Sequence, residues 1–392
     1  EDERAGYIDH RASAIPLITA VENLGTELIS LTVCSPATFP AMMEEIKKAD
    51  ESSNPYDVVH FDGHGVYNEQ TGLGALCFED PEDKDKPYKR KSVLIDADEI
   101  GKNLNDYKVP LMLLEACQTA KTQKKPTASV AVTLLEKGIT SVIAMTHSVL
   151  VTTASKFVET FYKEIANGAR VGKAVLDAQS ALARNTHRGK IPGAGDLHLQ
   201  DWFVPVLYQD ETDPQLFTQI IKKSGEQLIK KTKTPSIGKI AEQKEKMTHT
   251  FVGRSRELLA LERQFGKEQY ASIRGQGGSG KTAIALECAH WLVRTEQFQK
   301  AAFVCVEHVT EIRAVIDEIG QQLVPEGINY SVAEYKNNNE ALQPIHRELN
   351  DYATIVVIDN LESILPDPFQ KDEALIDDKL INELFELCES LL

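Results

Sequence analysis

A histidine and a cysteine in the first half of the chain combine residue types that together support nucleophilic catalysis. His64 lies between two glycines, directly after the apolar run Y-D-V-V-H-F (56–61). Cys117 follows a second apolar run, V-P-L-M-L-L-E (109–115). A thiol is mostly protonated at neutral pH, and an adjacent imidazole raises its thiolate fraction. The two residues therefore predict a cysteine nucleophile served by a histidine base.

The two flanking glycines separate this histidine from an ordinary buried one. Gly63 and Gly65 leave room for a substrate backbone, and the N–H of Gly65 can face a developing oxyanion. A lone cysteine is more often a small core residue, and a lone histidine more often a structural one. Two other histidines are rivals for the base: His60, which we expect to be buried in its strand, and His147, which follows the run 139–145.

Short apolar runs alternate with amphipathic segments over residues 1–209. This alternation is typical of an α/β domain with a mostly parallel sheet, in which the carboxyl ends of the strands form one ligand-binding edge. Pro205 predicts an edge position for the last strand, since proline has no N–H to donate. The strands are predicted at 56–61, 109–115, 139–145 and 202–208, and the helices at 96–104, 127–138, 152–167 and 171–184.

The run G-Q-G-G-S-G-K-T (275–282) matches the phosphate-binding loop G-x-x-x-x-G-K-[ST] at every fixed position. The sequence predicts the required context on both sides, with a strand at 270–274 and a helix at 280–294. Backbone N–H groups of such a loop surround phosphate oxygens, and the helix N-terminus adds partial positive charge. The predicted nucleotide-binding residues of the loop are Gly275, Gln276, Gly277, Gly278, Ser279, Gly280, Lys281 and Thr282.

The end of this loop and a later strand predict a magnesium site. We expect Lys281 to reach the β- and γ-phosphates and Thr282 to ligate Mg²⁺. The apolar strand 354–359 ends in Asp359, which we expect near the metal. Glu362 either orients a water or is an exposed acid at a helix start. The other predicted elements of this second α/β unit are a strand at 301–306 and a helix at 311–323.

The overall composition excludes several classes of protein. The 392-residue chain has 42% hydrophobic and 26% charged residues and a net charge of −16. Such an acidic globular composition argues against a general binder of nucleic acid or of membrane surfaces. The six cysteines are scattered without metal-ligand spacing, which fits free thiols in the cytoplasm. No apolar run is long enough to span a bilayer, and no signal peptide is visible.

A lysine-rich segment separates the two α/β regions. We expect a catalytic domain over 1–209, a linker over 210–247 and a nucleotide-binding domain over 248–392. The linker is either a solvated spacer or a basic contact for the acidic domains beside it.

Several segments of the first domain together resemble a CHAT domain, which belongs to the caspase–separase clan of cysteine peptidases. The match covers about 1–209 and implies a caspase-like sheet, a His64–Cys117 dyad, and oxyanion donors from the backbones of Gly65 and Cys117. The dyad spacing of 53 residues (64 to 117) is similar to that of caspase-type peptidases, about 50 residues. No strand signal precedes Arg11, so the resemblance implies that the first strand is missing. The segments are H-F-D-G-H-G, G-A-L-C-F-E-D, L-L-E-A-C-Q-T-A, S-V-I-A-M, F-Y-K-E-I-A-N-G-A-R-V-G-K-A-V and D-W-F-V-P-V-L-Y.

The second domain resembles the STAND class of ATPases, which includes NB-ARC and NACHT modules. The phosphate loop and the upstream run F-V-G-R (251–254) carry the resemblance, which covers roughly 248–392. It implies that Val252 and Arg254 lie against the adenine, and that exchange of ADP for ATP drives oligomerisation. Only 33 residues follow Asp359 (359 to 392), so we expect an incomplete domain.

Glu115 is the candidate specificity residue. Residues two apart in a strand point to the same side, so Glu115 and Cys117 share a face if the strand persists to the cysteine. A carboxylate beside the nucleophile favours a basic P1 side chain, and Glu115 resembles the Asp at the matching position of metacaspases. The alternatives are that it pairs with a structural Lys or Arg or simply faces water.

Together these features predict a cysteine endopeptidase under the control of an ATP-binding switch, in prokaryotic-type cytoplasmic signalling, defence or regulated cell death. ATP or ADP with Mg²⁺ are the expected ligands, a protein is the expected substrate, and we expect self-assembly on activation. Two alternatives remain: a catalytically silent CHAT module that docks other proteins, and an ATP-driven regulator whose first domain only binds partners.

Overall fold

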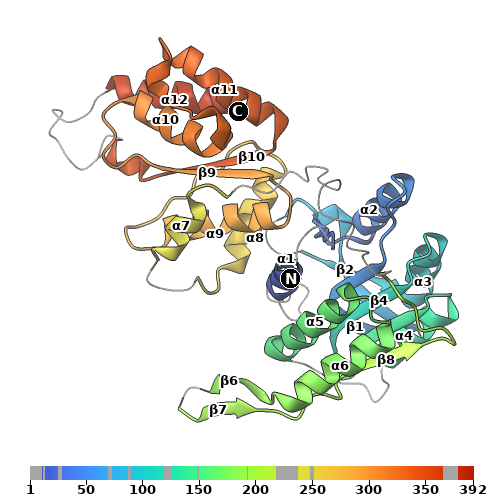
Figure 1. Cartoon of the computed structure of the whole chain (residues 1–392). Helices are drawn as coiled ribbons and strands as arrows, with labels where there is room; N and C mark the ends of the chain where they lie inside the picture. The colour runs from blue at the N-terminus through green and yellow to red at the C-terminus, as the bar shows by residue number, and fades with distance from the viewer. Residues whose placement is uncertain are drawn as a thin grey trace. The chain divides into compact units, whose positions relative to one another are not determined.

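The structure is a computed structural model with two compact units, Glu1–Gly225 and Glu226–Leu392, which we describe separately (Figure 1). Residues 218–236 of the predicted linker lie outside the described residues. These are residue 11 and residues 14–24, 29–68, 73–86, 90–118, 126–147, 150–191, 193–217, 237–247, 251–364 and 378–392.

A six-stranded sheet forms the centre of the first unit. Four of its strands, β3, β1, β4 and β5, run in one direction, while β2 and β8 run in the opposite direction. The predicted mostly parallel sheet is therefore confirmed, and Pro205 begins the predicted edge strand. In spatial order the strands are β3 (Ser92–Asp96), β2 (Leu73–Glu79), β1 (Val58–Asn68), β4 (Leu111–Gln118), β5 (Ser141–Met145) and β8 (Pro205–Gln209).

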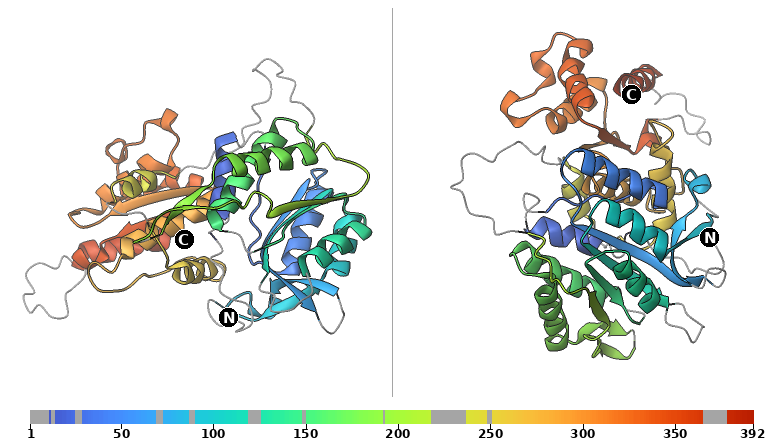
Figure 2. Two further views of the ribbon diagram at one scale, coloured as in Figure 1. Left: turned by 90° about the horizontal axis from the view of Figure 1, so that it is seen from below. Right: turned by 90° about the vertical axis from the view of Figure 1, so that its right-hand side faces the viewer.

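Helices cover both faces of this sheet, and strand parity decides which residues each layer buries (Figures 1 and 2). On one face Val59, Phe61 and Met112 pack with α2 (Phe39–Glu51), α3 (Ala97–Asp106) and α4 (Pro126–Glu136). On the other face Leu111 and Leu113 pack with α1 (Ala14–Leu24), α5 (Val151–Ala166) and α6 (Val171–Arg184). Residues 60, 62 and 64 of β1 therefore belong to the α5 face, because side chains alternate along a strand.

The strand that carries the histidine is longer than predicted. Its apolar run predicts an end at residue 61, with the glycines beyond it, but β1 continues to Asn68. The reason is β2, which pairs with the second half of β1 from the Gly65–Leu76 position onward. His64 and its glycines therefore lie within the sheet and not in a loop after it.

A hairpin extends from the helical layer of the α5 face. It consists of β6 (His187–Ile191) and β7 (Gly195–His198). The guanidinium of Arg188 is fully buried and donates to both carboxylate oxygens of Asp201, which also accepts a hydrogen bond from Thr153 of α5. This buried ion pair fixes the hairpin to the start of α5.

The second unit has a two-stranded parallel sheet with helices around it. β9 (Lys300–Cys305) and β10 (Thr354–Asp359) pair in register, and α10 and α11 pack with them in one apolar core. The helices are α7 (Ile240–Glu245), α8 (Ser255–Phe265), α9 (Lys281–Arg294), α10 (Ile312–Leu323), α11 (Asn338–Asp351) and α12 (Asp378–Leu391).

The strand predicted at 270–274 is not formed. Exposure alternates along it, with Tyr270 exposed and Ala271 half-buried, as in an extended chain. A strand also needs a hydrogen-bonded neighbour, and in the described part of this unit β9 and β10 pair only with each other. The phosphate loop therefore follows an extended segment rather than a strand.

The ends of the predicted linker pack against the two units. Asp213 accepts a hydrogen bond from the N–H of Gly172 at the start of α6. In the second unit, α7 contacts α9, and Lys239 and Lys244 form ion pairs with Glu318 and Glu287 at 2.7 Å each. No helix within the described ranges is long and apolar enough to cross a membrane.

Candidate active site and nucleotide site

The register of β1 and β4 brings the histidine and the cysteine together. The strands are parallel and pair without a shift from Val58–Leu111 to Gly65–Gln118, so His64 and Cys117 are direct partners. Positions paired in a parallel ladder lie on the same face, which here is the α5 face. His64 is half-buried, whereas the thiol of Cys117 lies outside the described part of the chain. The backbone alone thus places an imidazole next to the cysteine position.

Gly63 is a glycine for a reason that the sequence does not reveal. A Cβ built at Gly63 would lie 2.7 Å from two carbons of the Phe61 ring, which folds over the strand on the face opposite His64. That ring packs against Phe78 of β2 with 5.2 Å between the centroids. Core packing therefore requires glycine here, whether or not a substrate approaches.

Gly65 remains the candidate oxyanion donor. It is buried and lies between two neighbours in the sheet, Leu76 of β2 and Gln118 of β4. Its position directly after His64 and beside the end of β4 keeps it next to the candidate nucleophile.

The candidate specificity residue, Glu115, is buried and contacts a histidine. β4 persists through Cys117, so Glu115 occupies the same face as the cysteine, as predicted. Its side chain is 5% exposed, and its Oε1 lies 3.2 Å from Nε2 of His60, which is itself 11% exposed. The contact is neither of the predicted alternatives, because the partner is an imidazole and the carboxylate does not face open water.

Tyr162 of α5 completes this buried group and was not predicted from the sequence. Its hydroxyl lies 3.3 Å from Nδ1 of His60, and the two rings stack with 6.2 Å between centroids. Burial, with the nearby Glu115 charge, raises the pKa of Tyr162 far above its usual range, so the phenol stays protonated. In the sequence this tyrosine is only one of several apolar positions on an amphipathic helix.

The rival histidine, His147, lies just beyond β5, the neighbour of β4 on its other side. It is exposed, its Nδ1 is 3.1 Å from the hydroxyl of Thr146, and its ring meets Phe203 edge-on with 6.2 Å between centroids. Register does not pair it with Cys117 as it pairs His64. Of the two histidines, His64 is therefore the one that the register places beside the cysteine position.

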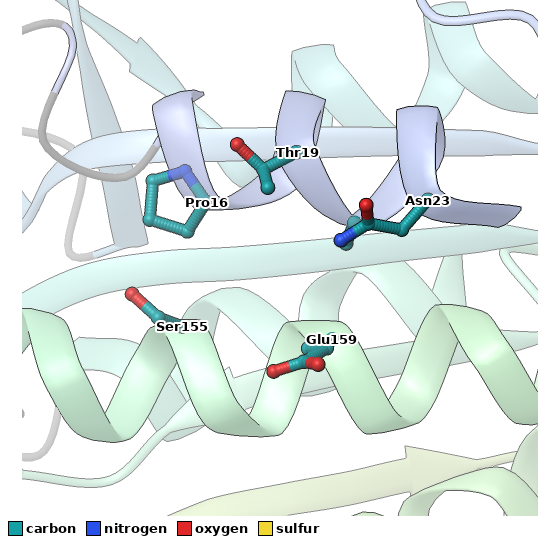
Figure 3. A pocket seen from close by; sticks show the side chains of 6 residues that line it. Pro16, Thr19, Asn23, Ser155 and Glu159 are labelled. Carbon is teal, nitrogen blue, oxygen red and sulfur yellow. The ribbon is translucent and has the colours of Figure 1, made fainter. Parts of the chain in front are cut away.

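A separate cleft of about 200 Å³ lies between α1 and α5 (Figure 3). None of the residues predicted from the sequence to take part in chemistry lines it. Its walls are Pro16, Thr19, Ala20, Asn23, Ser155 and Glu159.

The phosphate loop of the second unit has the backbone that its glycines predict. Gly278 and Gly280 have φ of 73° and 81°, a region that favours glycine. Gly280 is the N-cap of α9, so the first N–H groups of that helix follow the loop directly. The ammonium of Lys281 lies 3.2 Å from the carbonyl of Gly275 and 3.4 Å from the exposed carboxylate of Glu362.

The two predicted magnesium ligands are in contact. The hydroxyl of Thr282 lies 3.0 Å and 2.8 Å from the two carboxylate oxygens of Asp359, at the end of β10. A hydroxyl and a carboxylate side by side are the hard oxygen donors that Mg²⁺ uses beside phosphates. The residues present therefore fit a magnesium–nucleotide ligand.

The entry motif is hydrogen-bonded to the loop. Nη1 of Arg254 donates to the carbonyl of Ser279 at 2.9 Å. Gly253 and Arg254 have φ of 74° and 55°, and this turn leaves Val252 83% exposed. An apolar side chain presented beside a phosphate loop is consistent with the predicted adenine contact.

Comparison with protein families identifies both domains. The CHAT domain model matches residues 9–224, which is more than half of the chain. The NB-ARC domain model matches residues 215–363. A comparison with curated proteins found none that matches.

We predict that Gly63→Ala destabilises the first unit by about 1–3 kcal/mol, because the new methyl group overlaps the Phe61 ring. Phe61→Leu removes the obstructing ring, so the double variant should be more stable than the sum of the single effects. Calorimetry of the full chain measures this as the shift of the first unit's transition. Strict additivity would show that Phe61 is not the reason for the glycine.

We predict that Lys281→Ala weakens binding of ATP with Mg²⁺ by about tenfold to a hundredfold, since a charge-assisted contact to phosphate is lost. Titration calorimetry on the full chain measures the affinity. The matched control is Lys379→Ala, whose side chain is 80% exposed on α12. Equal affinity in wild type and Lys281→Ala would contradict the assignment of the loop.

Proposed function

The chain belongs to the CHAT domain family and continues into an NB-ARC domain, and from this we propose that it is a cysteine endopeptidase whose activity is switched by a nucleotide. The first unit is a protease-like module and the second a nucleotide-binding regulator. The observation that carries the proposal is the direct pairing of His64 with Cys117 across parallel strands.

In the proposed reaction His64 takes the thiol proton of Cys117, and the thiolate attacks the scissile carbonyl carbon. Backbone N–H groups of Gly65 and Cys117 stabilise the resulting oxyanion. His64 then protonates the leaving amine, the C–N bond breaks, and a thioester remains on Cys117. Water, deprotonated by His64, hydrolyses the thioester and restores the thiol. The half-buried position of His64 supports this role, because the imidazole is shielded yet accessible.

The proposed switch uses ATP or ADP with Mg²⁺. Thr282 and Asp359 would hold the metal, which neutralises phosphate charge when bound. Lys281 and the loop N–H groups would hold the phosphates, and Val252 and Arg254 would contact the base. The bond from Arg254 to Ser279 supports a coupling between occupancy of the loop and the entry turn. Exchange of ADP for ATP would then drive self-assembly and activate proteolysis in cytoplasmic signalling or defence.

Glu115 supports a preference for Lys or Arg at P1. Its carboxylate is nearly buried on the Cys117 face, and none of the described Lys or Arg residues forms an ion pair with it. A buried carboxylate without a fixed cation attracts a basic side chain strongly, because water screens it poorly.

We expect the full chain to cleave short peptides after Lys or Arg when ATP and Mg²⁺ are present, with a large loss in Cys117→Ala, His64→Ala and Lys281→Ala. Peptide cleavage followed by mass spectrometry measures both rate and cut site. Cys34→Ala is the matched cysteine control. Burial, with a smaller effect of Glu45, raises the pKa of Cys34 to about 11, so its thiol stays protonated and unreactive.

Two outcomes would redirect the assignment. Cleavage that survives in Cys117→Ala would exclude this nucleophile. Absence of cleavage under every nucleotide condition, with nucleotide binding intact, would favour a silent docking module.

A further inference from the structure

We propose that His60 and Tyr162 make the Glu115 site a proton-controlled receptor for the basic P1 side chain. When His60 is neutral, Glu115 presents a negative charge that binds the P1 cation; when His60 is protonated, that charge is cancelled and the cation is repelled. This deepens the proposed function, because it rests on Glu115 as the P1 contact and names the residues that regulate it.

The two partners of His60 can satisfy both states of its imidazole. When the ring is neutral, the hydroxyl of Tyr162, 3.3 Å from Nδ1, can donate to that nitrogen, while Nε2 carries the hydrogen and donates to Oε1 of Glu115 at 3.2 Å. When the ring is protonated, the same hydroxyl can accept from Nδ1. All three groups are satisfied with His60 neutral, and the set keeps the single negative charge of the carboxylate.

None of the described Lys or Arg residues forms an ion pair with Glu115. From α5 the titratable group that faces His60 is Tyr162, and the other buried residues of this helix are apolar except Thr153. The buried residues of α6 are apolar throughout. On the sheet, Glu115 faces His60 from β4, while Asp62 and His64 share its face along β1.

Protonation of His60 would change the charge of the site by one. Histidine is the side chain whose ordinary titration falls between pH 5 and 8. An imidazolium 3.2 Å from the carboxylate would neutralise it, and a P1 ammonium or guanidinium would then meet a like charge at close range. Binding of a cation should therefore weaken as the pH falls, independently of the dyad.

Benzamidine binding to the full chain carrying Cys117→Ala tests this without turnover, since the probe keeps its positive charge across the range. We expect the dissociation constant to rise about tenfold between pH 8 and pH 5.5. In His60→Gln, whose amide can still donate to Glu115 but cannot titrate, the rise should be less than about twofold. Benzamide, the neutral analogue, should bind weakly at both pH values.

Two further variants separate this role from a structural one. Glu115→Gln should abolish the preference for benzamidine over benzamide at pH 8. Tyr162→Phe removes the hydroxyl that contacts Nδ1 of His60, so the pH response should change. Circular dichroism checks that each variant is folded.

An unchanged pH response in folded His60→Gln would overturn the proposal, as would equal binding of the two probes at pH 8. A pH response that is the same in Tyr162→Phe would contradict the tyrosine's part in it. If these binding results hold but the wild-type chain cleaves nothing, the cation site stands and the peptidase assignment fails. Cleavage after Lys or Arg with a KM profile unaffected by His60→Gln would instead support the peptidase and exclude control by His60.

Discussion

The backbone hydrogen bonds between β1 and β4 determine where every candidate residue of the first unit lies. The two strands come from segments more than fifty positions apart, and their unshifted parallel pairing places His64 beside Cys117 and Asp62 beside Glu115. A shift of one residue would send one partner of each pair to the opposite face. Such a shift would also exchange the residues that a strand contributes to the two cores, so the packing on both faces holds the register in place.

The same register explains why a buried carboxylate is tolerated next to the cysteine position. Glu115 must lie on the α5 face because Cys117 does, and burial of its charge is unfavourable unless a polar partner is supplied. His60, on the neighbouring strand and the same face, is that partner, and Tyr162 fixes the imidazole from the helix above. The side chains that satisfy this buried carboxylate are thus also those of the proposed cation site.

The apolar runs alone predicted the strands that became β1, β4 and β5. They also predicted that the strands carrying His64 and Cys117 are parallel neighbours. The phosphate loop and Asp359 could also be predicted from the sequence, because their chemistry requires fixed residue types at fixed spacing. In the structure, the side chains of Thr282 and Asp359 are in contact. The contact of Tyr162 with His60 could not be predicted from the sequence. The two residues are 102 positions apart, and the contact depends on how α5 crosses the sheet.

Other differences also arise from tertiary contacts. β1 runs past its apolar segment because β2 pairs with it. Residue 63 must be glycine because the ring of Phe61, two residues earlier on the same face, would overlap a Cβ there. Residues 270–274 have the composition of a strand but no hydrogen-bonded neighbour in the described part of the second unit. Local sequence reports side-chain preference, whereas these features depend on which segments become neighbours.

The most direct test of the central claim is the pH dependence of Cys117 alkylation by iodoacetamide, resolved from the other cysteines by peptide mass spectrometry. A thiolate formed by an adjacent imidazole reacts at a pH well below the ordinary thiol range. We predict that the inflection for Cys117 lies at least about one pH unit lower in the wild-type chain than in His64→Ala, and that His147→Ala leaves it unchanged. Identical profiles in wild type and His64→Ala would contradict the dyad.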